Sequence, residues 1–301
     1  MRLLRWPLLL ICLAGLYCTE VKAEGVPLSV FYRVLMIQTV KGQGTGFTLD
    51  IDGRQYLVTA KHIVAGLQPE DTIQVRRYDA SGNLKWVNFR MKIFMCDDRV
   101  DIAVLIPPEQ LTMSTHMDPV SEGPVFGQDV YFVGFPFGSA MEFSASTIEI
   151  TSPFGYVKRA MISSIKAGGT GEKRTVQYIL DGHNIGGFSG SPVVYRPGGG
   201  NADPEVVAIM SSYTPDYGPV LTPKQIRREE ATPDDYGKGR IVEANGHIYR
   251  LEEPTKTIDQ RYVLLNTGIA NAYAIKHAVD LIRLHPDGPR VAADFKPSRA
   301  R

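Results

Sequence analysis

Short apolar runs separated by turn residues dominate the chain from about residue 30 onward. The runs 47–51 and 55–58 flank Asp52-Gly53, a dipeptide that favours the tight turn of a β-hairpin. Further runs of strand length lie at 72–75, 91–94 and 102–105. This pattern predicts β-strands rather than helices in the first third of the chain.

A second series of strand-like runs follows a polar, proline-rich stretch at 107–124, which we interpret as a linker. We expect strands at 130–133, 146–150, 175–180, 192–194 and 206–210. The pattern therefore divides the chain into two β units, at about 28–115 and about 120–268.

A polar, charge-rich insertion at 214–261 interrupts this second unit. Its composition favours a solvated surface loop over a lid that controls access of substrate. Within it, the runs 241–244 and 247–251 around Asn245-Gly246 predict a small hairpin.

The end of the second unit shows helical periodicity. Ala274, Ala278, Leu281 and Ile282 fall at helical spacing. We therefore expect a C-terminal helix at about 270–284 that packs on the second unit.

The first 23 residues follow the pattern of a cleavable export signal. Arg2 and Arg5 precede an apolar run that begins at Trp6 and ends at Tyr17, and Ala23 provides a small residue for signal peptidase. The run is shorter than the roughly 20 residues of a membrane-spanning helix. We expect residues 1–23 to be removed and residues 24–301 to be periplasmic or secreted without a stable membrane span, with a retained anchor as the alternative.

Composition narrows the classes of partner and cofactor. Removal of Cys12 and Cys18 with the signal would leave Cys96 as the one remaining cysteine, so no intramolecular disulfide is expected. The net charge of +1 gives no indication of nucleic-acid binding. The histidines show no metal-ligand spacing, so we expect neither a metal nor another cofactor, and the composition specifies no oligomeric state.

The segment from Gly186 to Pro192 presents one serine in a glycine-rich turn. Glycines at 187 and 190 permit backbone conformations closed to other residues, so the N–H groups of Gly187 and Ser189 can converge on one point. Two such donors would form an oxyanion hole. Ser189 would then be a nucleophile, if a general base lies nearby.

His62 and Asp101 supply the other two parts of such a site. His62 follows the apolar run 56–58 and Asp101 precedes 102–105, so both lie at strand ends. The order His, Asp, Ser excludes the α/β-hydrolase arrangement, in which the serine comes first. Each residue alone is as compatible with an ordinary structural role, but their joint occurrence in this order predicts a catalytic triad.

These segments resemble trypsin-like serine proteases, in particular the bacterial, disulfide-free type related to the HtrA catalytic domain. The resemblance covers about 42–283 and includes Gly44-Thr45-Gly46-Phe47 and the run 130–138, which ends in Pro-Phe-Gly. It implies an all-β, chymotrypsin-like fold of two six-stranded antiparallel β-barrels with a C-terminal helix. No segment of the size of a PDZ domain follows.

The resemblance also implies the roles of individual residues. His62 would be the general base, Asp101 its orienting acid and Ser189 the nucleophile, with the oxyanion hole formed by the amides of Gly187 and Ser189. His183 and Met210 would form the base and wall of the primary specificity pocket. Ser211 would pair with the substrate backbone and support Asp101, although an ordinary strand serine is an equal alternative.

A protein or peptide is therefore the expected substrate. Neither His183 nor Met210 supplies an acid, so we expect an uncharged residue before the cut bond in preference to Lys or Arg. Phe188 cannot make the ion pair that activates digestive members of the family, and we expect it to fill the core under the nucleophile loop. The sequence thus predicts an exported serine endopeptidase, with a catalytically inactive peptide-binding module of the same fold as the alternative.

Overall fold

The computed structural model describes residues 25–79, 81–120, 124–141, 151–170, 174–197, 202–219, 222–252 and 262–295. The expected signal peptide and the strand predicted at 146–150 lie outside these ranges. Strands dominate the described part, and none of its helices is long and apolar enough to cross a membrane.

The first β-barrel follows a short helix, α2 (Leu28–Phe31), and its sheet has the order β5-β4-β1-β2-β3-β7-β6. Met91 alone separates β5 from β6, which lie at the two edges of this sheet, so the sheet curls round on itself. The strands are β1 (Val34–Thr39), β2 (Gly42–Ile51), β3 (Arg54–Thr59), β4 (Thr72–Tyr78), β5 (Leu84–Arg90), β6 (Lys92–Met95) and β7 (Ala103–Ile106).

The predicted hairpin joins β2 to β3. Ile51 pairs with Arg54, and the two residues between them have φ of +50° at Asp52 and +72° at Gly53. Positive φ at both positions gives the turn a twist that matches the two strands. The prediction from this dipeptide is confirmed.

The second β-barrel has the strand order β12-β9-β10-β11-β17-β13, and the pairing of β12 with β13 closes it. Two residues of the linker, β8 (Asp118–Pro119), add a short parallel strand beside β13. The barrel strands are β9 (Asp129–Gly134), β10 (Tyr156–Gly168), β11 (Thr175–Asp181), β12 (Pro192–Tyr195), β13 (Glu205–Pro219) and β17 (Tyr262–Ala274). The chymotrypsin-like pair of barrels is therefore confirmed.

The C-terminal helix, α5 (Lys276–Leu284), begins six residues later than expected. Ala270, Ala272 and Ala274 are buried at alternate positions and form the end of β17, where small side chains face the barrel interior. The period of two in these alanines overrides the helical spacing between Ala274 and Ala278.

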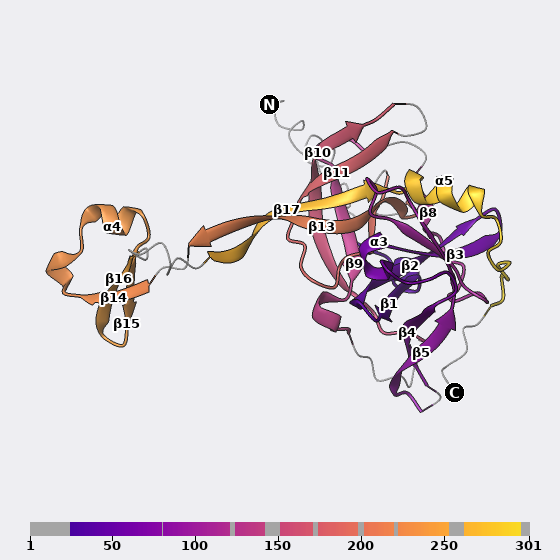
Figure 1. Ribbon diagram of the computed structural model, residues 1–301, viewed down its shortest axis with the longest axis horizontal. Coiled ribbons are helices and arrows are strands. Elements are labelled where there is room, and N and C mark those ends of the chain that lie inside the picture. Colours follow the sequence, from indigo (N-terminus) through magenta and orange to yellow (C-terminus); the bar gives the residue numbers. More distant parts are fainter. Residues whose placement is uncertain are drawn as a thin grey trace, which may run out of the picture.

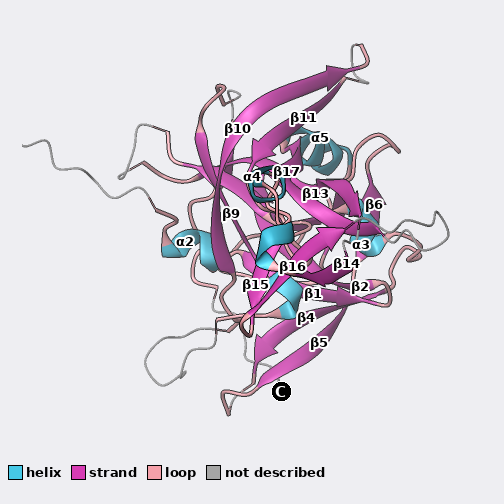
Figure 2. Cartoon of the chain, turned by 90° about the vertical axis from the view of Figure 1, so that its left-hand side faces the viewer, coloured by secondary structure: helices cyan, strands magenta, loops and turns pink. Residues whose placement is uncertain are grey.

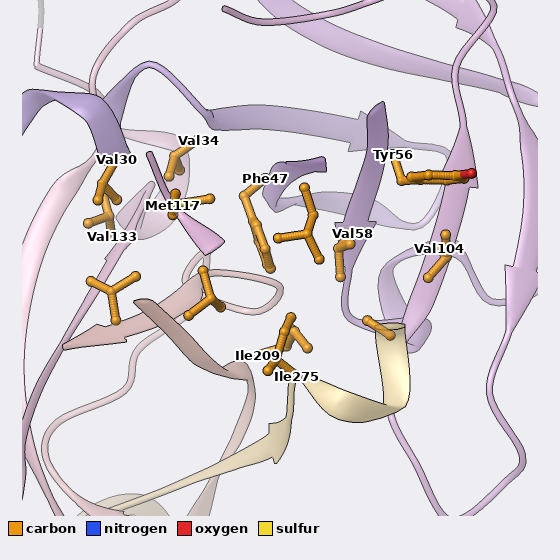
Figure 3. Packing of buried hydrophobic residues seen from close by; sticks show 14 of the residues in the cluster. Val30, Val34, Phe47, Tyr56, Val58, Val104, Met117, Val133, Ile209 and Ile275 are labelled. Carbon is orange, nitrogen blue, oxygen red and sulfur yellow. The ribbon is translucent and has the colours of Figure 1, made fainter. Parts of the chain in front are cut away.

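The two barrels share one hydrophobic core. Figure 3 shows Phe47 and Val58 of the first barrel facing Ile209 of the second and Ile275 at the start of α5. Each barrel also has an interior cluster of its own, which contains Leu35 and Leu57 in the first and Phe132 and Val193 in the second.

Beyond α5 the chain returns to the first barrel and runs beside β3. The N–H of Gln55 donates to the carbonyl of Pro289 at 2.9 Å, and the N–H of Val291 donates to the carbonyl of Gly53 at 2.9 Å. We call residues 289–291 the C-terminal strap. The strap adds backbone pairing to the first barrel.

The insertion is not the surface loop that its composition suggested. β13 and β17 extend past the second barrel as a two-stranded ribbon, at the end of which Figures 1 and 2 show a small three-stranded sheet with a helix. We call this the tip module. It contains β14 (Thr222–Ile226), the 3-10 turn η3 (Arg228–Glu230), α4 (Pro233–Gly237), β15 (Ile241–Ala244) and β16 (His247–Glu252).

The tip module has a minimal core of its own. Ile226 and Ile248 are buried and pair in adjacent strands, so each covers the other. The hairpin expected around Asn245-Gly246 is confirmed as β15 and β16.

Candidate active site

His62 and Asp101 meet at the end of the first barrel. His62 lies in α3 (Lys61–Val64), directly after β3, and Asp101 precedes β7, the strand paired with β3. The imidazole Nδ1 lies 2.8 Å from Asp101 Oδ2, and the backbone N–H of His62 donates to Asp101 Oδ1 at 2.9 Å. The carboxylate therefore fixes both the ring and the backbone of His62.

Ser211 completes the surroundings of Asp101 from the second barrel. Its hydroxyl donates to Asp101 Oδ2 at 2.5 Å. Burial alone would raise the pKa of the Asp101 carboxyl, but the hydrogen bonds from His62 and Ser211 hold this pKa below its ordinary value. Asp101 is thus ionised at neutral pH and acts as an acceptor for His62.

A β-bulge at Ser211 explains its orientation. Met210 pairs with Ala272 and Ser212 with the next residue, Asn271, so Ser211 is the extra residue on β13. A bulge redirects the side chain of the extra residue. Here it sends the hydroxyl of Ser211 to Asp101 and leaves its carbonyl facing Ser189.

Ser189 lies on a loop held by both barrels. Its carbonyl accepts the N–H of Thr45, and the Thr45 hydroxyl donates to the carbonyl of Gly187. Gly190 has φ of +84°, and a side chain there would meet the carbonyl oxygen of Thr45. The Gly-Thr-Gly segment of β2 therefore shapes the nucleophile loop.

The Ser189 hydroxyl donates to the carbonyl of Ser211 at 2.9 Å. Among the described residues it makes no hydrogen bond to His62. Its acceptor is thus a backbone carbonyl beside the His62–Asp101 pair, from which a rotation of the side chain could release it.

Gly187 presents a backbone amide beside this hydroxyl. Its φ is +100°, and a Cβ would lie 2.0 Å from the carbonyl oxygen of Phe135, so glycine is required. The carbonyl of Gly186 accepts the N–H of Phe137 at 2.8 Å, which fixes the peptide group before Gly187. Within the described part of the chain, the N–H groups of Gly187 and Ser189 donate to no acceptor, so both are available to an incoming oxyanion.

A cavity of about 310 Å³ adjoins these groups. Asn184 is 2% exposed, and its Oδ1 has no hydrogen-bond partner among the described residues. The described residues of the cavity wall include no carboxylate and are His62, Asn184, Ile185, Gly186, Ser189, Ser211, Ser212 and Tyr213.

Two predicted pocket residues lie elsewhere. His183 is exposed, and its carbonyl accepts a hydrogen bond from Lys158. Met210 is fully buried in the interior of the second barrel. Neither side chain is part of the cavity wall, which instead contains Asn184, the neighbour of His183, and Ser211, the neighbour of Met210.

Phe188 lies under the nucleophile loop as expected. It is fully buried and meets Phe132 edge to face, with ring centroids 5.1 Å apart. This contact anchors the residue next to Ser189 in the second barrel.

The sequence of residues 44–209 matches the family model of the trypsin-like peptidase domain, and the match spans more than half of the chain. No curated protein matches the sequence. Similar solved structures include the active form of the Rv3671c protease from M. tuberculosis, which is 14% identical, with a TM-score of 0.50 over 90% of this chain and 88% of that chain.

Two other solved proteases are similar in fold. The MamO protease domain from Magnetospirillum magneticum is 14% identical, with a TM-score of 0.45 over 84% of this chain and 96% of that chain. The HtrA-type protease AlgW, solved with a tripeptide, is 17% identical, with a TM-score of 0.45 over 85% of this chain and 60% of that chain. On the sequence match and the two barrels, the chain belongs to the trypsin-like peptidase family.

Proposed function

We propose that this chain is a serine endopeptidase that hydrolyses peptide bonds through an acyl-enzyme. The observation that carries the proposal is the hydrogen-bonded set of His62, Asp101 and Ser211 beside the Ser189 hydroxyl. The backbone N–H groups of Gly187 and Ser189 have no acceptor in the described part of the chain and are free to bind an oxyanion. A nucleophile, an oriented base and an oxyanion hole are the parts that acyl transfer requires.

The first step would be attack of Ser189 Oγ on the substrate carbonyl as its proton passes to His62 Nε2. Asp101 accepts a hydrogen bond from the Nδ1–H of His62 and stabilises the imidazolium that forms. The N–H groups of Gly187 and Ser189 would bind the oxyanion. His62 then donates its proton to the leaving amine, and water attacks the ester in the second half of the cycle.

The serine must leave the carbonyl of Ser211 before it can give its proton to His62. A substrate backbone N–H that donates to this carbonyl would compete with the Ser189 hydroxyl for the same acceptor. Binding of an extended peptide would therefore favour the orientation of Ser189 toward His62.

The contact between Ser189 and Ser211 also supports a second candidate function. A serine held by a backbone carbonyl in the resting protein would suit a module that binds peptides without cleaving them. The two functions differ in one property, the reactivity of the Ser189 oxygen toward an electrophile.

A fluorophosphonate probe tests this reactivity because it forms a stable bond with an activated serine. We expect the purified protein to be labelled at Ser189 and to cleave casein, whereas Ser189→Ala should show neither reaction. Ser164→Ala, an exposed serine of β10, is the matched control and should be labelled like the parent. Equal cleavage of casein by Ser189→Ala and the parent would refute the assignment.

We also propose that the enzyme is exported and acts in the periplasm or outside the cell. The support is the pattern of residues 1–23, in which basic residues precede an apolar run and the last residue, Ala23, is small. Mass spectrometry of the N-terminus of protein from an exported fraction should find residue 24 first. An intact N-terminus in the membrane fraction would instead show a retained anchor.

A further inference from the structure

β13 has one paired edge and one open edge next to the active-site cavity. β17 pairs with β13 from Ala208 to Pro219, with register shifts at 210–212 and 213–215, whereas β12 ends opposite Ile209. From Ser211 onward, the edge of β13 that faces away from β17 therefore has no strand partner in the described part of the chain. Ser211 and Tyr213 also line the cavity, so this open edge begins beside Ser189.

Hydrogen bonds fix which backbone groups face the open edge. The carbonyl of Ser211 faces the cavity, where it accepts the Ser189 hydroxyl. The carbonyl of Thr214 points the other way, because it accepts the hydroxyl of Thr267 on β17 at 2.7 Å. Alternate residues of a strand face opposite edges, so the N–H and carbonyl of Tyr213 face the open edge as well.

Pro215 is the next residue whose backbone faces this open edge. All peptide bonds of the described residues are trans, and in a trans peptide the carbonyl and the nitrogen substituent point in opposite directions. Since the Thr214 carbonyl points to β17, the ring of Pro215 points to the open edge. The side chain is exposed, so the described chain leaves this side of the ring uncovered.

A proline in this position ends strand pairing. It has no N–H to donate, and its ring occupies the space that a strand at the usual spacing of about 4.8 Å would need. Prolines are tolerated in strands where their nitrogen faces an unpaired edge. An extended peptide could therefore form backbone hydrogen bonds with Ser211 and Tyr213 at the edge beside Ser189. Pairing would stop at Pro215.

We propose that Pro215 is a specificity-determining residue that limits the backbone recognition of substrate to about three residues before the cut bond. The inference rests on the proposed function, because its kinetic test requires that the protein cleave peptides. An antiparallel peptide would place the residue before the cut opposite Ser211, the third residue opposite Tyr213 and the fifth opposite Pro215. Residues farther from the cut gain no backbone hydrogen bonds from the ribbon.

The test uses internally quenched peptides with one cleavage site and acyl sides of increasing length. For the parent, kcat/KM should rise up to about the third residue and then stay within about twofold. For Pro215→Ala, it should rise again at about the fifth residue, by roughly threefold to tenfold, the effect of one added backbone hydrogen bond. Pro223→Ala, the same change on β14 of the tip module, is the control and should follow the parent.

If kcat/KM of the parent kept rising beyond the third residue, the proposal would be overturned. The same holds if kcat/KM did not rise at about the fifth residue in either Pro215→Ala or a second variant, Pro215→Val. The parent profile requires no variant, so a folding defect cannot mask the result. Fluorescence anisotropy with Ser189→Ala measures the Kd of the same peptides without hydrolysis. If the parent neither cleaves nor reacts with fluorophosphonate, the proposed function fails. The inference about Pro215 is then decided by the Kd values, and it fails if Kd keeps falling with peptide length beyond the third residue.

Discussion

Ser211 connects the two barrels at the level of single atoms. Its hydroxyl binds Asp101 of the first barrel, and its carbonyl binds Ser189 of the second. Both contacts depend on one bulge in β13. The orientation of the acid and that of the nucleophile are therefore set by the same residue.

Replacement of Ser211 by alanine should reduce catalysis without unfolding the protein. Loss of the hydroxyl removes a hydrogen bond that lowers the pKa of Asp101, so this pKa should rise and the carboxylate should hold His62 less well. We expect kcat/KM at pH 7 to fall about threefold to thirtyfold, and the loss of activity on acidification to begin at a higher pH. A pH–rate profile measures both effects, with Ser164→Ala as the control, and an unchanged profile would contradict this role.

Asn184 should control the residue accepted before the cut bond. The described part of the cavity wall has no carboxylate, and burial of an unpaired cation costs several kcal/mol, so the parent should prefer uncharged residues over Lys and Arg. Asn184→Asp would place an acid in a buried position of this wall. Profiling of a peptide library by mass spectrometry should then show cleavage after Lys or Arg enriched about tenfold or more over the parent.

The control for this experiment is Asn88→Asp, an exposed site of β5 that should keep the parent's preference. Strong cleavage after Lys or Arg by the parent would mean that an acid outside the described cavity wall reaches the substrate.

Site residues that belong to short sequence motifs could be predicted from the sequence. Residues that line the pocket because of how the strands pack could not. His62, Asp101, Ser189 and Gly187 lie in short motifs whose spacing reflects local backbone geometry. The pocket assignment to His183 and Met210 followed sequence position alone. Met210 faces the barrel interior, and the chain carries Asn184 rather than the neighbouring His183 into the wall.

Among the elements, the position of α5 depends on a histidine. His277 lies on α5, and its Nε2 accepts the N–H of Val176 on β11 at 3.0 Å. Burial lowers the pKa of His277 below its ordinary value, while Asp280 and Lys276 on the same helix and Asp97 of the first barrel also act on it. A neutral ring can accept this N–H, whereas a protonated ring cannot.

The stability of the protein should therefore fall on acidification through His277. Because the folded pKa lies below the unfolded value of about 6.5, the contribution is complete above that pH and is lost as pH falls toward the folded value. His277→Gln should lower the free energy of unfolding by about 1 kcal/mol at pH 8 and by less at pH 5.

Urea unfolding at the two pH values measures this difference. His116→Gln, which changes an exposed histidine, should show the same dependence on pH as the parent. If the free energy of unfolding depended on pH in the same way in His277→Gln and in the parent, the proposed role of His277 would be contradicted.

Two strands illustrate where the apolar pattern is a poor guide to elements. β10 was not predicted because its apolar residues do not alternate with polar ones and most of its residues are exposed, and its outer half pairs with β11 alone. β17 was not predicted because Asn266, Thr267 and Gly268 separate its apolar start at 262–265 from its three buried alanines. Both strands are held by backbone pairing with other segments of the chain. The pattern of apolar residues within one segment does not reveal such pairing.

At the scale of the whole molecule, the tip module is separate from the core that holds the active site. Ile226 and Ile248 belong to none of the three core clusters of the described residues. The ribbon of β13 and β17 remains paired as far as Pro219 and Tyr262. An Asn-Gly turn in place of residues 220–261 should therefore close this ribbon as a hairpin.

We expect this deletion to change the Tm of the barrels by less than about 3 °C, because no core contact is lost. Labelling of Ser189 by fluorophosphonate should keep its rate within about twofold. Unfolding of the shortened protein, or loss of labelling, would show that the tip module supports the active site directly.

The C-terminal strap has a consequence for how such a protein can change over evolutionary time. The chain begins in the first barrel, builds the second and ends against β3, and α5 contributes Ile275, Ala278 and Ile282 to the core that both barrels share. Neither barrel can be exchanged for a homologous half without a matched change in this last segment. Variation is thus easiest at the ribbon between β13 and β17, which leaves the core untouched, and this is where the chain carries its largest addition.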